Sequence, residues 1–144
     1  MGAWSQGNFG NDIASDWVWE LEKSKGLDFL LSPILAVLNN SEYVEADTCC
    51  EALAASEVIA ASFTRDYSLI PEEARDWLNR KQGWLFGSTP KITSEHAKLA
   101  LDAVRKISSD SELLELWEES SEDGEWKGVQ NALIAKLDIA SESS

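Results

Sequence analysis

The chain has 144 residues, of which 44% are hydrophobic, and its 26 acids against 12 Lys and Arg give a net charge of −14. This length and apolar content suit one domain with a packed core and exclude disorder as the default state. The negative charge disfavours binding to nucleic acid or to an anionic membrane and favours a basic protein partner.

The charge is unevenly spread along the chain. Residues 1–64 and 108–144 each contain ten acids and two lysines, a net of −8, whereas residues 65–107 contain six acids and eight bases, a net of +2. Residues 1–26 hold four acids and no apolar run, so we expect no signal peptide. The longest apolar stretch, residues 27–38, is too short to span a bilayer. These features indicate a cytoplasmic protein.

The N-terminal stretch "AWSQGNFGNDIASDW" combines glycines, large aromatic residues and an Asn-Asp pair. Its glycines permit a tight chain path, and Trp4 and Phe9 supply apolar area. Asn11 or Asp12 can cap the helix that follows. We therefore expect this arm to fold back on the first helix as a structural element.

Helical spacing of apolar residues predicts a compact all-α bundle of about six to seven helices. The first predicted helix ends before Gly26 and has apolar residues along one side, namely Ile13, Trp17, Val18 and Leu21. A second helix is predicted over 28–38, with a restart at Ser32, as an N-cap, and Pro33. Residues 45–63 are rich in alanine and apolar on most faces, which predicts a helix in the middle of the bundle.

Cys49 and Cys50 are adjacent within this central helix. Neighbouring residues point to different faces of a helix, and a metal site would need C-x-x-C spacing with further ligands. We interpret them as two small buried residues.

A fourth helix is predicted to begin at Pro71 and to bury Trp77, followed by a Gly/Pro-containing loop over 83–93. A fifth helix covers 94–107, and Ser109 with Glu112 forms a predicted capping box for a sixth. The last helix has an apolar stripe at 3-and-4 spacing, made of Trp126, Val129, Leu133, Leu137 and Ala140. We expect a single domain over residues 1–140 and a disordered tail over 141–144.

Four stretches together resemble a known family. They are Met1-Gly2-Ala3-Trp4 with Gly7, Phe9, Asn11, Asp12, Ala14, Asp16 and Trp17; Glu51 to Ala61; Ile70 to Trp77; and Ser111 to Glu119 with Trp126, Leu133 and Leu137. In these features the chain resembles the bacterial domain-of-unknown-function family 4259, although Ser5 stands where that motif usually has glycine. The resemblance implies one fold along nearly the whole chain and leaves function open.

Residues 110–125 contain eight acids and no base. Such a run is usually a solvated helix face, but its density also suits a partner with a basic cleft. The candidate partner-binding residues are Glu115, Glu118, Glu119, Glu122 and Asp123, together with Trp84 and Phe86 of the 83–93 loop. The alternative interpretation of this loop is that it folds over the core. The leading hypothesis is an interaction protein, such as an immunity or antitoxin-type inhibitor.

The alternative is a small-ligand-binding or cation-binding protein, or an enzyme, that uses Asn11, Asp12 and Asp16 with the single histidine, His96. Asp12 and Asp16 share a helical face, but two carboxylates are few ligands for a cation. No nucleophile, phosphate-binding or metal motif occurs, so we expect no catalytic residues, no metal and no cofactor. A structural role is predicted for Trp4, Phe9, Trp17, Trp117 and Trp126.

Overall fold

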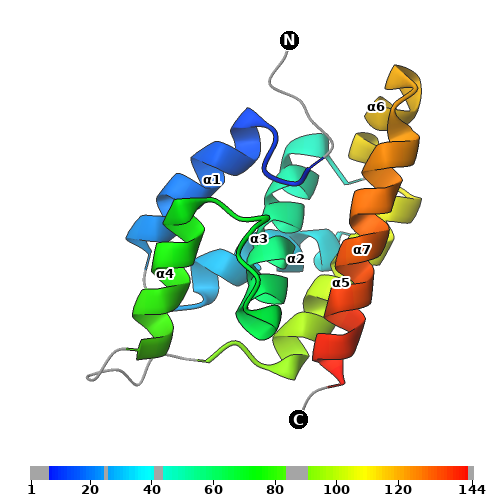
Figure 1. The fold of residues 1–144 in the computed structure, drawn as a ribbon. Helices are drawn as coiled ribbons and strands as arrows, with labels where there is room; N and C mark the ends of the chain where they lie inside the picture. The colour runs from blue at the N-terminus through cyan, green and yellow to red at the C-terminus, as the bar shows by residue number, and fades with distance from the viewer. Residues whose placement is uncertain (1–6, 25, 41–43, 84–90, 143–144) are drawn as a thin grey trace.

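The computed structural model describes residues 7–24, 26–40, 44–83 and 91–142, and within them it contains helices and no strand (Figure 1). The helices are α1 (Asp12–Lys23), α2 (Asp28–Asn39), α3 (Ala46–Thr64), α4 (Glu72–Gly83), α5 (Ser94–Ser109), α6 (Glu112–Ser120) and α7 (Asp123–Ser141). The predicted all-α fold is therefore confirmed. Ser141, which we assigned to the tail, is the last residue of α7, and residues 143–144 lie outside the described part of the chain.

Helix α3 forms the centre of the fold. It lies among the other described helices and contacts all six of them (Figure 1). Every residue from 52 to 61 is buried. A helix that is apolar and small on most faces can be surrounded in this way, because no side needs to meet water. The central position predicted for this alanine-rich helix is confirmed.

Helices α1, α2 and α4 are joined by aromatic side chains. The Trp17 ring of α1 stacks on Phe29 of α2, with ring centroids 5.6 Å apart. Trp77 of α4 is buried and donates its indole N–H to the Ser24 carbonyl oxygen at 3.3 Å, where α1 ends. The predicted inward position of Trp77 is thus confirmed, and its bond fixes α4 beside α1.

Helix α2 runs through Pro33 without a break, so the predicted restart with Ser32 as N-cap is wrong. Proline in a helix interior removes one hydrogen bond. Here Leu30, Ile34 and Val37 are all fully buried on both sides of the proline, and their packing outweighs that loss.

In the described part of the chain, no helix is long and apolar enough to cross a membrane.

The junction between α5 and α6 differs from the predicted capping box. Ser109 belongs to α5 and donates to the Arg105 carbonyl oxygen, whereas Ser111 caps α6 by accepting from the Leu114 amide at 3.1 Å. Glu112 accepts a hydrogen bond from the Ala46 amide at 2.7 Å instead of closing the box. The helix start is therefore set by a contact with the first turn of α3, which local sequence does not reveal.

Candidate functional site

The acidic residues of α6 and the α6–α7 turn form an exposed surface. Glu115, Glu118 and Glu119 are exposed on α6, and Glu122 is exposed just before α7. Leu116 lies among them with 45% of its area exposed, although Trp117 beside it is buried. We call Glu115, Leu116, Glu118, Glu119 and Glu122 the acidic face. On α6 the exposed Leu116 follows Glu115 and is three residues from Glu119, while Trp117 packs into the bundle.

A lysine of α7 lies next to this surface. Lys127 contacts the carboxylates of Glu118 at 3.3 Å and Asp123 at 3.4 Å. Hydrogen bonds to Glu118 and Asp123 raise the pKa of Lys127 above its ordinary value. Glu118 and Asp123, both predicted partner-binding residues, are therefore partly neutralised within the protein itself. Trp84 and Phe86, the other two predicted, lie outside the described residues.

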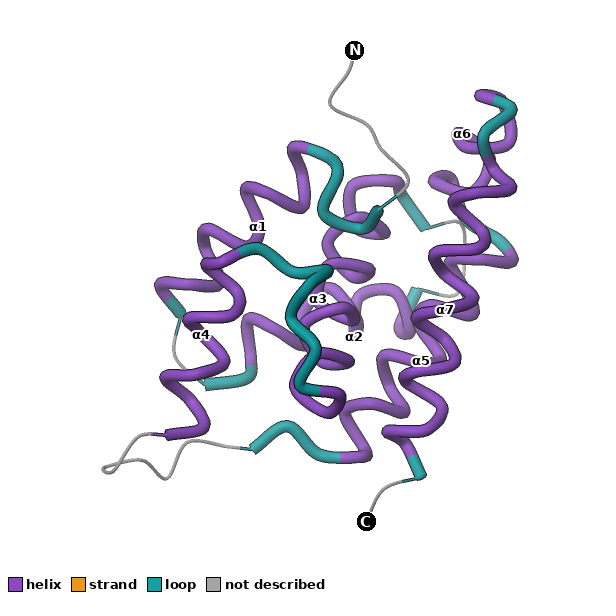
Figure 2. Tube along the Cα trace, in the orientation of Figure 1, coloured by secondary structure: helices purple, strands orange, loops and turns teal. Residues whose placement is uncertain are grey.

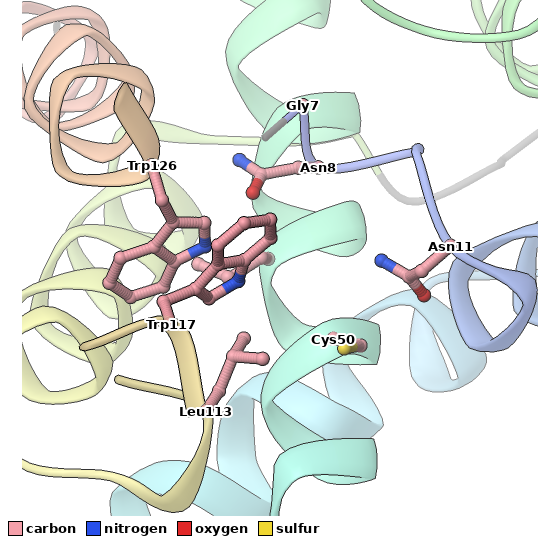
Figure 3. A pocket seen from close by; sticks show the side chains of 8 residues that line it. Gly7, Asn8, Asn11, Cys50, Leu113, Trp117 and Trp126 are labelled. Carbon is pink, nitrogen blue, oxygen red and sulfur yellow. The ribbon is translucent and has the colours of Figure 1, made fainter. Parts of the chain in front are cut away.

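Two tryptophans hold the acidic face against the bundle. The rings of Trp117 on α6 and Trp126 on α7 stack with centroids 6.4 Å apart, and both are buried. Figure 3 shows these indoles side by side, with Asn8 above them and Leu113 and Cys50 below. The pocket between these residues has a volume of about 10 Å³, enough for one water molecule and no ligand.

The N-terminal Asn-Asp region is used for helix capping. The Asn11 side chain accepts a hydrogen bond from the Ala14 amide at 2.8 Å, while Asp12 and Asp16 are exposed. Asp16 borders a shallow pocket of about 230 Å³ with Glu20 and Glu51. Even so, the described residues contain no group of three or more His, Cys, Asp or Glu arranged to hold a metal ion.

Asn11→Ala is expected to lower the free energy of unfolding by about 1 kcal/mol, the usual effect of removing an N-cap. The reason is that the Ala14 amide loses its acceptor at the start of α1. Urea denaturation of the variant beside wild type measures this, with Asp12→Ala as the control at an exposed neighbour. An unchanged midpoint would show that the cap has no energetic role.

His96 lies away from the Asn-Asp region. It sits in the first turn of α5, where its Nδ1 accepts a hydrogen bond from the Thr93 amide at 2.9 Å. Figure 1 shows that α5 begins at the opposite end of the molecule from the start of α1. The structure therefore does not bring His96 together with Asn11, Asp12 and Asp16. Its observed contact is a helix cap.

A buried polar network occupies the position where the N-terminal arm meets the bundle. The Asn8 and Gln130 amides pair reciprocally, at 3.1 Å and 2.7 Å, and the Asn8 Nδ2 also donates to Glu57 Oε2 at 2.9 Å. All three residues are more than nine-tenths buried. The bonds of Asn8 thus reach beyond α1 to α3 and α7, and they fix the described part of the arm to both helices.

Sequence reasoning missed this network, although two signals pointed to it. Glu57 is the one charged residue among residues 52–61, and Gln130 is a polar residue in the stripe that includes Trp126 and Leu133. Burial raises the pKa of Glu57 above its ordinary value, and the hydrogen bond from Asn8 and the charge of Lys136 lower it in part. A polar residue at a buried helical position needs a partner, and here the arm supplies it.

An open groove lies beside the network. It has a volume of about 790 Å³ and runs between the arm, α7 and the segment that follows α3. Figure 2 shows that segment, residues 65–71, returning along α3 before α4 begins. The groove is lined by Gly7, Asn8, Phe9, Gly10, Glu57, Ser68, Leu69, Glu125, Gly128, Val129, Ala132, Leu133 and Lys136.

The two cysteines are buried and free, as predicted from their position in α3. Burial raises the pKa of Cys49 to about 11 and that of Cys50 to about 12. Both therefore remain thiols at neutral pH, and the thiolate is the form that acts as nucleophile or metal ligand.

Comparison with known proteins places almost the whole chain in one family. The model of a family described as "Domain of unknown function (DUF4259)" matches residues 2–129, which confirms the family that the sequence resembles. No curated protein and no solved structure matches the chain.

Proposed function

The chain belongs to the DUF4259 family, a domain of unknown function, and we propose that it is an acidic interaction protein of the bacterial cytoplasm. In this proposal it binds a basic protein and covers that protein's basic site, as an immunity or antitoxin-type inhibitor does. The observation that carries the proposal is the acidic face, in which exposed Leu116 lies among exposed carboxylates.

The composition of the acidic face suits protein recognition. Glu115 and Glu119 are four residues apart on α6, so they lie on the same side of the helix, and Leu116 is three residues from Glu119. An apolar contact with a charged rim is the usual plan of a protein interface. Carboxylates on the rim would accelerate the approach of a basic partner and reject acidic ones.

The packing of α6 supports the same proposal. Leu113, Leu114 and Trp117 are buried, so α6 packs on the bundle through its inner side, and the carboxylates of the acidic face are exposed. A surface that is already ordered loses little side-chain and backbone freedom on binding. By contrast, Asn11 is engaged in a cap and His96 lies elsewhere, so the alternative site gains no support from their positions.

Charge reversal of the acidic face is expected to abolish partner binding. The variant Glu115→Lys, Glu118→Lys, Glu119→Lys and Glu122→Lys places four cations where the partner's basic site would dock, and like charges there should weaken affinity by more than about tenfold. Tagged protein is used to capture partners from a lysate of the source organism. It is also co-expressed with the product of the adjacent gene. The affinity of each variant for the captured protein is then measured by titration.

The matched control reverses four exposed acids away from this surface. Asp12→Lys, Asp16→Lys, Glu20→Lys and Glu72→Lys give the same change in net charge. We expect the control to retain the partner and the wild-type complex to weaken as salt is raised. Capture of no partner, or equal retention by both variants, would contradict the proposal.

A further inference from the structure

The groove beside the arm contains a buried carboxylate with few donors. Glu57 is 4% exposed, and among the described residues the hydrogen bond from Asn8 Nδ2 to Oε2 is the one that it accepts. An ionised carboxylate can accept about four hydrogen bonds through its two oxygens. Glu57 also lines the groove, so a molecule in the groove can supply the missing donors.

The charges around the groove favour a cation. Glu57 and Glu125 both line it, and Lys136 is the single base among the lining residues in the described chain, which leaves an excess of one negative charge. The Lys136 charge acts on Glu57 only through space, since no hydrogen bond or ion pair joins them in the described structure. A buried carboxylate without a close positive partner is costly, and a bound cation would relieve that cost.

The remaining lining sets the size and character of the occupant. The volume of about 790 Å³ lies in the usual range of small-molecule sites. Phe9, Leu69, Val129 and Leu133 supply apolar walls, and Gly128 leaves one wall open. The lining therefore combines apolar contact area with one buried acceptor.

We propose that this groove binds a small organic cation, an amine or guanidine with an apolar body, whose N–H groups donate to Glu57. The apolar body lies between Phe9 and the exposed side of α7, and the cationic group points to the floor where α3 and the arm meet. This site is separate from the acidic face, and it uses Asn8 to orient the Glu57 carboxylate.

The proposal is tested on the full chain with 2-phenylethylamine as the probe and 2-phenylethanol as its neutral counterpart. Amide chemical shifts in ¹H–¹⁵N NMR spectra report where each probe binds. We expect saturable shifts from the amine at residues 7–10, near residue 57 and along residues 125–136. The alcohol should bind at least about tenfold more weakly, a difference worth roughly 1.4 kcal/mol.

Two variants locate the site. Glu57→Gln keeps an acceptor for Asn8 but removes the charge, and it should weaken amine binding at least about tenfold, while Glu119→Gln on the acidic face should not. Gly128→Leu should block the groove, because a side chain there meets open space; Gly124→Leu is its matched control on the same helix, outside the lining.

Loss of amine binding in Glu57→Gln and Gly128→Leu, with both controls unaffected, supports the site. Absence of saturable shifts, equal binding of the alcohol, or binding that survives Gly128→Leu would overturn it. The Gly128 pair tests the proposal even if Glu57→Gln does not fold. None of these results depends on whether a protein partner binds the acidic face.

Discussion

Trp126→Ala is expected to lower the free energy of unfolding by about 3–5 kcal/mol, the usual loss when a buried aromatic side chain is emptied. Trp126 is 2% exposed and stacks on Trp117, so the substitution leaves a cavity and removes a stacking contact between α6 and α7. Because small domains have a total stability of roughly 5–15 kcal/mol, this single change should remove a large share of it.

Urea denaturation followed by circular dichroism measures the change without relying on tryptophan fluorescence. Trp19→Ala is the matched control, since Trp19 is 54% exposed and its ring lies under Lys23 Nζ, 3.1 Å from the ring centroid. An exposed cation–π contact contributes about 0.5–1 kcal/mol, so the control should lose no more than that. Equal losses in the two variants would contradict the buried stack described here.

The helices that could be predicted are those whose own periodicity decides their burial. The alanine-rich stretch over 45–63 was recognisable as central because its apolar residues cover most faces, and α3 proved to be the centre. In α7, Trp126, Leu133, Leu137 and Ala140 are buried as their spacing predicted. Burial of this kind follows from a repeat within one segment, which is visible without knowing its neighbours.

The features that sequence could not reveal depend on contacts between distant segments. Ser109 and Ser111 are both good N-cap residues. Ser111 is the one that caps α6, and the next residue, Glu112, accepts a hydrogen bond from the Ala46 amide, 66 positions away along the chain. Val129 belongs to the predicted apolar stripe, yet it is only partly buried, whereas Gln130 is fully buried and bonds to Asn8 of the arm. The candidate groove depends on the same long-range pairing and was missed for the same reason.

The described residues of the arm test part of its predicted structural role. We expected aromatic residues to hold it, and Phe9 does pack against the core. The sequence does not reveal the bonds of Asn8, because an asparagine in a turn between Gly7 and Gly10 is typical of a loop. Trp4 lies outside the described residues, so the large stabilising role predicted for it stays a prediction.

Asn8→Ala is expected to lower the free energy of unfolding at neutral pH by at least about 1–3 kcal/mol, the penalty for leaving a buried polar group without its partner. The substitution removes the donor to Glu57 and both bonds to Gln130. Because Glu57 is a buried acid, its loss of the Asn8 hydrogen bond should make up much of this penalty. Glu57→Gln in the same background should recover part of it, since a neutral amide is less costly to bury.

The size of the Asn8→Ala penalty should depend on pH in a definite direction. Burial raises the pKa of Glu57 above its ordinary value of 4.5, and the hydrogen bond from Asn8 opposes that rise. Removing Asn8 therefore raises the pKa of Glu57 further. A carboxyl group with a raised pKa in the folded state binds its proton more tightly than in the unfolded state, so folding loses stability as pH rises from 4.5 through the raised pKa.

The difference in stability between wild type and Asn8→Ala should therefore be larger at neutral pH than near pH 4.5, where more of Glu57 is protonated in both proteins. Urea denaturation at the two pH values gives this difference, and the other carboxyl groups cancel because they titrate alike in the pair. Asn11→Ala serves as the control, since its cap bond to Ala14 joins groups that do not titrate. If the Asn8→Ala difference is the same at both pH values, Glu57 is not the group that Asn8 stabilises, and the network has been assigned the wrong energetic role.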